Sequence, residues 1–318
     1  MIFFNDTKFD ILSESFYSKL SQIEKNKSME EVKKAEEHLS GSKGSTDSTD
    51  SELTLLLVSD IHGATEELDK LIAHCKEKIK ERINYVIVLG DFDNLNNDDP
   101  DTHMVPSSKL ESIAREELLK LEFFSVPILY IPGNHDAPSL YTDKPTLTKQ
   151  SVNIQGKAYK LAEGIQIVGF GGSVPGYIKG KEHWPGWPYK SEEEYATKFK
   201  EIAQIHLNYT TQTLLATHVG PFSSSTSRDT FEKFPEIIKG GCKYLDEVNM
   251  KEENNILANL HGHIHEGTGR ANLHRKEIIN PGSVKQGNFA ILRLGRGPSL
   301  QRWDVKSLEL ISFDYASE

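Results

Sequence analysis

The segment LTLLLVSDIHG at residues 53–63 joins a short, mostly apolar run to a polar turn that carries Asp60 and His62. An apolar run of this length, closed by a turn, is typical of a strand buried on both faces of a parallel sheet. Side chains at the carboxyl end of such a strand lie where open α/β sheets bind ligands. The segment therefore predicts an α/β fold with a site at one edge of the sheet.

The same pattern recurs along the chain. Further strand-like runs occupy residues 85–89, 128–131, 165–170, 213–217 and 256–260, and stripes of helical spacing occupy 68–79 and 110–118. This alternation predicts a mostly parallel α/β beginning. Closely spaced strand candidates after Gly267 predict a second, more antiparallel sheet.

Polar side chains follow five of the runs. They are Asp60 and His62, then Asp91, then Asn134, His135 and Asp136, then His218, and finally His261, His263 and His265. Imidazoles, carboxylates and one amide, without a thiolate, suit Mn, Fe or Zn better than a soft metal. Six or seven ligands exceed what one tetrahedral ion needs and fit two ions that share a bridge. Paired ions of this kind deprotonate a water for in-line attack on a phosphate ester.

The ordered motifs DxH, GDxxN, GNHD, THxGP and GHxH resemble those of the calcineurin-like metallophosphoesterase superfamily over roughly residues 53–290. The resemblance implies a sandwich of two mixed β-sheets flanked by α-helices. It also implies a metal-dependent hydrolase of phosphomonoesters or phosphodiesters, which acts through a metal-bridged hydroxide. Two divalent ions are expected, drawn from Mn, Fe, Zn and Mg.

Carried over by position, the resemblance implies one ion bound by Asp60, His62 and His265, and a second bound by Asn134, His218 and His263. Asp91 would bridge the two ions.

The same resemblance implies that His135 donates a proton to the leaving oxygen or stabilises the developing charge, and that Asp136 orients His135. Many relatives have a carboxylate at the position of Asn94, and the protein phosphatases often have an arginine where Leu95 stands. This departure weakens a close comparison with protein phosphatases and leaves the metal ligands intact.

The first 51 residues differ in composition from residues 52–318, which we expect to form the catalytic domain. Residues 9–23 have helical spacing, and the Gly/Ser/Thr/Asp-rich segment 41–52 resembles a flexible linker. The N-terminal helical extension is then a poorly ordered leader, a docking helix for a protein partner, or an extra helix packed on the domain.

Two insertions are candidates for selecting the substrate. Residues 93–108 are acidic and rich in Asn, and we expect a surface loop there. Residues 171–190 are rich in Gly, Pro and aromatics, a composition that predicts no regular structure and is common in binding rims. Trp184 is expected either to contact substrate or to pack against its own domain. Two interpretations of His261 stay equally open: it supports the metal ligands, or it is an ordinary residue at the end of a strand.

Charge and cysteine content limit the function classes. A formal charge of -10 disfavours nucleic acid and anionic membranes as partners, and so disfavours a nuclease. Cys75 and Cys242 are expected to be reduced, which together with the lack of a signal sequence or membrane helix predicts a cytoplasmic protein.

The substrate would be a phosphorylated small molecule or a phosphoprotein. The alternative is a non-catalytic interaction module that retains the fold, and the intact ligand positions favour the enzyme.

Overall fold

The computed structural model describes residues 51–142, 146–178, 181–229, 238–297 and 302–313. The predicted N-terminal extension lies outside these residues, apart from Ser51. Within the described ranges, no helix has both the length and the apolar composition that crossing a bilayer requires.

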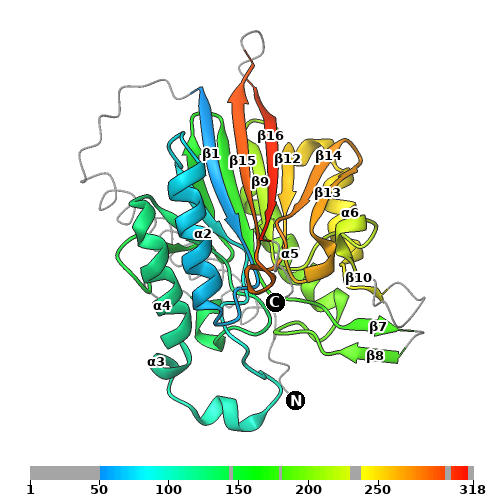
Figure 1. The fold of residues 1–318 in the computed structure, drawn as a ribbon. Coiled ribbons are helices and arrows are strands. Elements are labelled where there is room, and N and C mark those ends of the chain that lie inside the picture. Colours follow the sequence, from blue (N-terminus) through cyan, green and yellow to red (C-terminus); the bar gives the residue numbers. More distant parts are fainter. Residues whose placement is uncertain (1–50, 143–145, 179–180, 230–237, 298–301, 314–318) are drawn as a thin grey trace, which may run out of the picture. The chain divides into compact units, whose positions relative to one another are not determined.

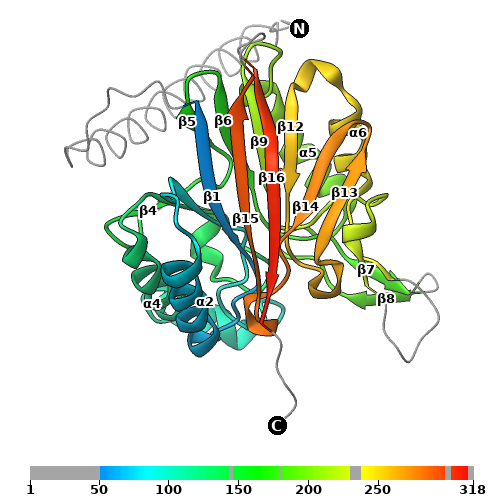
Figure 2. The ribbon, with the colours of Figure 1, turned by 45° about the horizontal axis from the view of Figure 1, so that its top comes forward.

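The first sheet has six strands in the order β16-β15-β1-β2-β3-β4. The bounds are β1 Glu52–Val58, β2 Tyr85–Val88, β3 Ile128–Tyr130, β4 Ser151–Asn153, β15 Asn288–Arg296 and β16 Trp303–Ser312. Strands β1 to β4 are parallel to their neighbours, whereas β15 and β16 are antiparallel. Figure 2 shows β1, β15 and β16 running side by side.

The second six-stranded sheet has the order β13-β14-β12-β9-β6-β5. Its bounds are β5 Ala158–Ala162, β6 Ile165–Phe170, β9 Gln212–Thr217, β12 Ile256–Leu260, β13 Gly269–Leu273 and β14 Lys276–Asn280. The inner strands β6, β9, β12 and β14 pair in parallel, and only the edge strands β5 and β13 are antiparallel.

The two sheets pack face to face and are joined by hydrogen bonds between them. The Tyr85 hydroxyl of the first sheet donates to the Leu161 carbonyl of the second at 2.8 Å. Gln212 donates to the Trp303 carbonyl at 2.9 Å and accepts from the Trp303 amide at 2.6 Å. Leu57 and Leu214 are both fully buried.

Helices cover the outer faces of the sandwich (Figure 1). Their bounds are α2 Thr65–Lys78, α3 Ser107–Leu110, α4 Ser112–Leu121, α5 Glu192–His206 and α6 Lys243–Met250. The side chains of α2 and α4 share one apolar cluster with β1, β2 and β3. Those of α5 and α6 share another with β6 and β9. Leu68 and Leu71 of α2 are buried as their spacing predicts, each stabilising the fold by about 1.5–3 kcal/mol.

The sandwich confirms the expected fold class, but two expectations about its parts are wrong. Strands after Gly267 form no separate antiparallel sheet, because β13 and β14 extend the second sheet while β15 and β16 return to the first. The segment 171–190 is partly regular. It contains β7 Gly176–Ile178 and β8 Lys181–Trp184, which join β10 Arg228–Asp229 and β11 Ile238–Lys239 in a small four-stranded sheet.

Short 3₁₀ helices occupy several connections. They are η1 Pro100–Met104, η2 Glu122–Phe124, η3 Pro138–Tyr141, η4 Ser225–Ser227, η5 Glu252–Asn254, η6 His265–Gly267 and η7 Val284–Gln286. One of them, η7, lies beside the site described next.

Candidate metal centre

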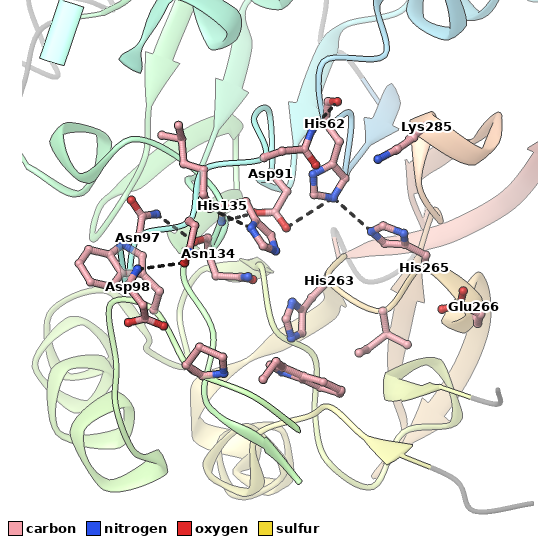
Figure 3. Close-up of a pocket in the computed structure, with 17 residues that line it drawn as sticks. His62, Asp91, Asn97, Asp98, Asn134, His135, His263, His265, Glu266 and Lys285 are labelled. Carbon is pink, nitrogen blue, oxygen red and sulfur yellow. Dashed lines mark hydrogen bonds and ion pairs between the residues drawn. The ribbon is translucent and has the colours of Figure 1, made fainter. Parts of the chain in front are cut away.

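The polar residues that follow the strands come together from both sheets. Loops after β1, β2 and β3 of the first sheet meet loops after β9 and β12 of the second, each at the carboxyl end of a parallel strand. Figure 3 shows His62, Asp91, His263 and His265 directed toward one another in one pocket. The sequence predicted a single rim, and the structure builds that rim from two sheets.

Four of the expected ligands adopt a left-handed backbone. The φ angles are 53° at Asp60, 54° at His62, 56° at Asp91 and 68° at His263. This conformation costs an L-residue about 1–2 kcal/mol, so it persists only where surrounding contacts hold it. Here the Asp60 amide donates to the Gly90 carbonyl at 2.9 Å, and the His62 amide donates to the Asp91 carbonyl at 3.0 Å. The loops after β1 and β2 therefore brace each other.

One group of possible ligands consists of Asp60, His62 and His265, whose ligand atoms lie within 4.8 Å of one another. Nε2 of His265 lies 3.3 Å from Nε2 of His62 and 3.3 Å from Oδ1 of Asp60. Nδ1 of His62 bonds the Asp93 carbonyl at 2.9 Å, so Nδ1 carries the proton and Nε2 offers its lone pair to the pocket.

A second group consists of Asp91, His218 and His263. Nε2 of His218 lies 3.2 Å from Oδ2 of Asp91 and 3.0 Å from Oδ1 of Asn134. Nδ1 of His218 bonds the Leu89 carbonyl at 2.7 Å, which again directs Nε2 inward. Asn134 thus lies beside the second group, in contact with His218.

Asp91 faces both groups. Its Oδ2 atom lies 3.2 Å from Nε2 of His218 and 3.8 Å from Nε2 of His62. Its Oδ1 atom accepts a hydrogen bond from the His135 amide at 2.8 Å, which fixes the plane of the carboxylate. One carboxylate between two sets of imidazoles is the arrangement that a bridging ligand requires.

The charges of the cluster suit cations. Burial raises the pKa of Asp60, but the hydrogen bond and charge of His265 outweigh this and lower it to about 2. Burial lowers the pKa of His218, yet Asp91 raises it to about 9, so an ion that binds Nε2 of His218 must displace a proton from this ring. Burial, followed by the His218 charge, lowers the pKa of His263 to about 3, so that imidazole is neutral at physiological pH. Anionic carboxylates and neutral imidazole are the ligand forms that divalent ions bind.

A buried ligand atom without a hydrogen-bond partner also fits a metal site. Nε2 of His263 is buried and has no hydrogen-bond partner among the described residues. A buried polar atom without a partner costs about 1–3 kcal/mol, which a coordinated ion would offset. With nitrogen and oxygen donors and no thiolate, both groups fit Mn, Fe, Zn or Mg.

His135 is exposed in the pocket, and its ring packs edge-on against His62 with the centroids 5.5 Å apart. Nδ1 of His135 bonds the Leu95 carbonyl at 3.0 Å. The expectation that Asp136 orients this ring is not met. Both oxygens of Asp136 instead accept backbone amides, from Gly133 and Asp91 on Oδ2 and from Phe92 and Asp93 on Oδ1. Asp136 therefore shapes the loop that carries Asp91.

Other residues support the site, and except for Asn94, which lies in the GDxxN motif, they had no clear signal in the sequence. The Asn97 amide donates to the carbonyls of Asn134 and Asp136 at 3.0 and 2.8 Å, although its segment looked like a solvated loop. Asn94 donates to the His62 carbonyl at 2.8 Å, a bond that a carboxylate could not donate. Glu117 is fully buried and accepts from the Gly63 amide at 3.0 Å. An acid at that apolar position of α4 was the one available clue.

The pocket over the cluster has a volume of about 540 Å³. Both predicted substrate-selecting segments line it, one through Asn94 to Asp98 and the other through Trp184, Pro185 and Trp187. Lys190 links them, because it pairs with Asp98 and lies 4.9 Å over the Trp187 ring.

Two residues that the sequence left open are now placed. Trp184 packs edge-on against His263, with the centroids 5.9 Å apart, and also lines the pocket. His261 is buried away from the pocket and bonds the Thr226 hydroxyl at 2.8 Å. His261 therefore supports the chain after β12 and is no ligand.

The sequence model of the calcineurin-like phosphoesterase family matches residues 53–267. No curated protein matches the chain. One solved structure, 15% identical, covers 82% of this chain and 99% of its own with a TM-score of 0.59, which shows the fold alone. A dimetal phosphatase from Danio rerio is 15% identical over 80% of this chain and 99% of its own, with a TM-score of 0.46. The phosphopantetheinyl hydrolase from Mycobacterium tuberculosis is 17% identical over 81% of this chain and 96% of its own, also with a TM-score of 0.46. Since the family model spans more than half of the sequence, the chain belongs to the calcineurin-like phosphoesterase family.

Proposed function

We propose that this protein is a metal-dependent hydrolase of phosphate esters. The observation that carries the proposal is the position of Asp91, whose carboxylate faces two groups of ligands at the floor of one pocket. A non-catalytic module would have no need to keep seven donors and strained backbone angles in this arrangement.

The residues divide into two sets around that carboxylate. Asp60, His62 and His265 would hold one ion, and Asn134, His218 and His263 would hold the other, with Asp91 shared. Two divalent ions bound there supply Lewis-acid activation of a water and neutralise charge on the phosphoryl oxygens.

His135 supplies the proton that the leaving group needs. Because Nδ1 is hydrogen-bonded to the Leu95 carbonyl, a protonated ring presents its second N–H, on Nε2, to the pocket. An imidazolium held in this way donates to the leaving oxygen as the ester bond breaks. Asp136 acts more remotely, by fixing the loop of Asp91 through four amide hydrogen bonds.

A phosphorylated small molecule fits better than a phosphoprotein. The cavity of about 540 Å³ lies within the usual range for small-molecule sites. Trp184 and Trp187 give it an aromatic wall, and Asn96 and Asn97 also line it. A cytoplasmic location is part of the proposal, because Cys75 and Cys242 are both free and buried.

Elemental analysis of the purified protein, followed by paired assays, tests the function. We expect about two divalent ions per chain, with turnover of either 4-nitrophenyl phosphate or its diester. A protein that contains both ions and hydrolyses neither ester would favour the interaction module.

A further inference from the structure

Lys285 is the one cationic side chain among the pocket-lining residues of the described chain. It belongs to η7, between β14 and β15, and the sequence motifs did not point to it. Figure 3 shows it on the same side of the pocket as His62 and His265. The other charged side chains that line the pocket outside the ligand cluster are the carboxylates of Asp98 and Glu266.

The backbone of Lys285 is fixed to the loop of the metal ligand Asp60. The Lys285 amide donates to the Asp60 carbonyl at 3.3 Å, and the Ser283 hydroxyl donates to the same carbonyl at 2.8 Å. The Val284 amide donates to the Ser59 carbonyl at 2.9 Å. Three hydrogen bonds therefore hold the base of this lysine at a set place beside the first ligand group.

The ammonium group of Lys285 is free to meet a ligand. Its side chain is exposed, and it forms no ion pair with a carboxylate of the described residues. Lys190, the lysine that links the two pocket walls, is instead neutralised by Asp98. In a chain with a net charge of -10, an unpaired cation beside a metal cluster attracts anions.

We propose that Lys285 binds a non-bridging oxygen of the substrate phosphoryl group and thereby favours phosphomonoesters over phosphodiesters. This inference rests on the proposed function and narrows its substrate class. A phosphomonoester dianion carries one more negative charge than a diester, so it gains more from a nearby ammonium. Lysine suits the task because its flexible stem lets the charge follow the phosphoryl group.

Replacing the charge tests the assignment. For Lys285→Met we expect kcat/KM for 4-nitrophenyl phosphate to fall by about tenfold, mostly through KM, as for a lost charge-assisted hydrogen bond. Bis(4-nitrophenyl) phosphate carries half the charge of the monoester dianion, so the same contact is worth about half as much free energy and kcat/KM should fall by only about threefold. Lys285→Arg should recover part of the monoester activity. Lys306→Met, which removes an exposed lysine of β16 outside the pocket, is the matched control and should behave as the parent.

Titration calorimetry with inorganic phosphate separates this inference from the proposed function, because it requires no turnover. With metal-loaded protein, we expect Lys285→Met to bind phosphate about tenfold more weakly than the parent, with unchanged metal content. The role of Lys285 would be overturned if the parent and Lys285→Met bound phosphate equally well. It would also be overturned if kcat/KM fell equally for the monoester and the diester. A parent that binds phosphate through Lys285 but hydrolyses neither ester would overturn the proposed function and leave the contact standing.

Discussion

Replacing His135 by alanine should separate proton donation from metal binding. The ring is exposed, so its removal leaves no buried cavity, and Asp91 keeps the hydrogen bond that it accepts from the backbone amide of residue 135. Both ions should therefore stay bound. Loss of a general acid lowers turnover by about 100- to 10,000-fold, which corresponds to about 2.7–5.5 kcal/mol in the barrier.

The assay compares leaving groups. The loss in kcat for His135→Ala should be largest on an alkyl phosphate, whose leaving oxygen needs a proton, and smallest on 4-nitrophenyl phosphate, whose leaving group needs little protonation. His274→Ala, at the exposed turn between β13 and β14, is the control and should match the parent on both substrates. Equal losses on good and poor leaving groups, or a loss of metal, would refute proton donation by His135.

Further changes test the supports of the site. Asp91→Asn should reduce metal content and turnover together, and a fully active variant with two ions would remove the bridge. Asn97→Ala should lower the free energy of unfolding by about 1–3 kcal/mol, since two buried carbonyls lose their donor, and an unchanged urea midpoint would contradict this. Burial raises the pKa of Glu117 well above 4.5, so the folded protein binds this proton more tightly than the unfolded chain does. The parent protein therefore loses stability as the pH rises from 4.5 to the raised pKa of Glu117. Glu117→Gln should lose less stability between pH 5 and pH 8. If the free energy of unfolding of the parent and of the variant changed equally with pH, the assigned role of Glu117 would be wrong. Deleting residues 1–51 should leave folding, metal content and small-substrate turnover intact, whereas a melting temperature many degrees lower would show that the extension packs on the domain.

The main site residues could be predicted because their positions depend on local structure. Asp60 and His62 lie at the end of β1, and His263 and His265 follow β12, so each pair could be placed at the carboxyl end of its own strand. That β1 and β12 belong to different sheets, whose ends meet at the site, did not follow from the pattern. The sequence also contains the polar and apolar pattern that fixes α2 and the first strands.

Other parts depend on contacts between distant segments, which a pattern along the chain does not encode. The apolar runs of β15 and β16 gave no information on which sheet they would join. Asn97 and Lys285 acquire their roles only because the loop after β2 meets the loop after β3, and η7 meets the loop after β1. The resemblance implied that Asp136 orients His135, but the carboxylate of Asp136 turns toward the backbone of Asp91.

Metal titration of chelator-treated protein tests the central claim most directly. Stripped protein should hydrolyse no phosphate ester, and its turnover should rise as Mn²⁺ is added until about two ions per chain are bound. Full activity after chelation, or activity that saturates at one ion per chain, would contradict a site in which Asp91 joins two metal ions.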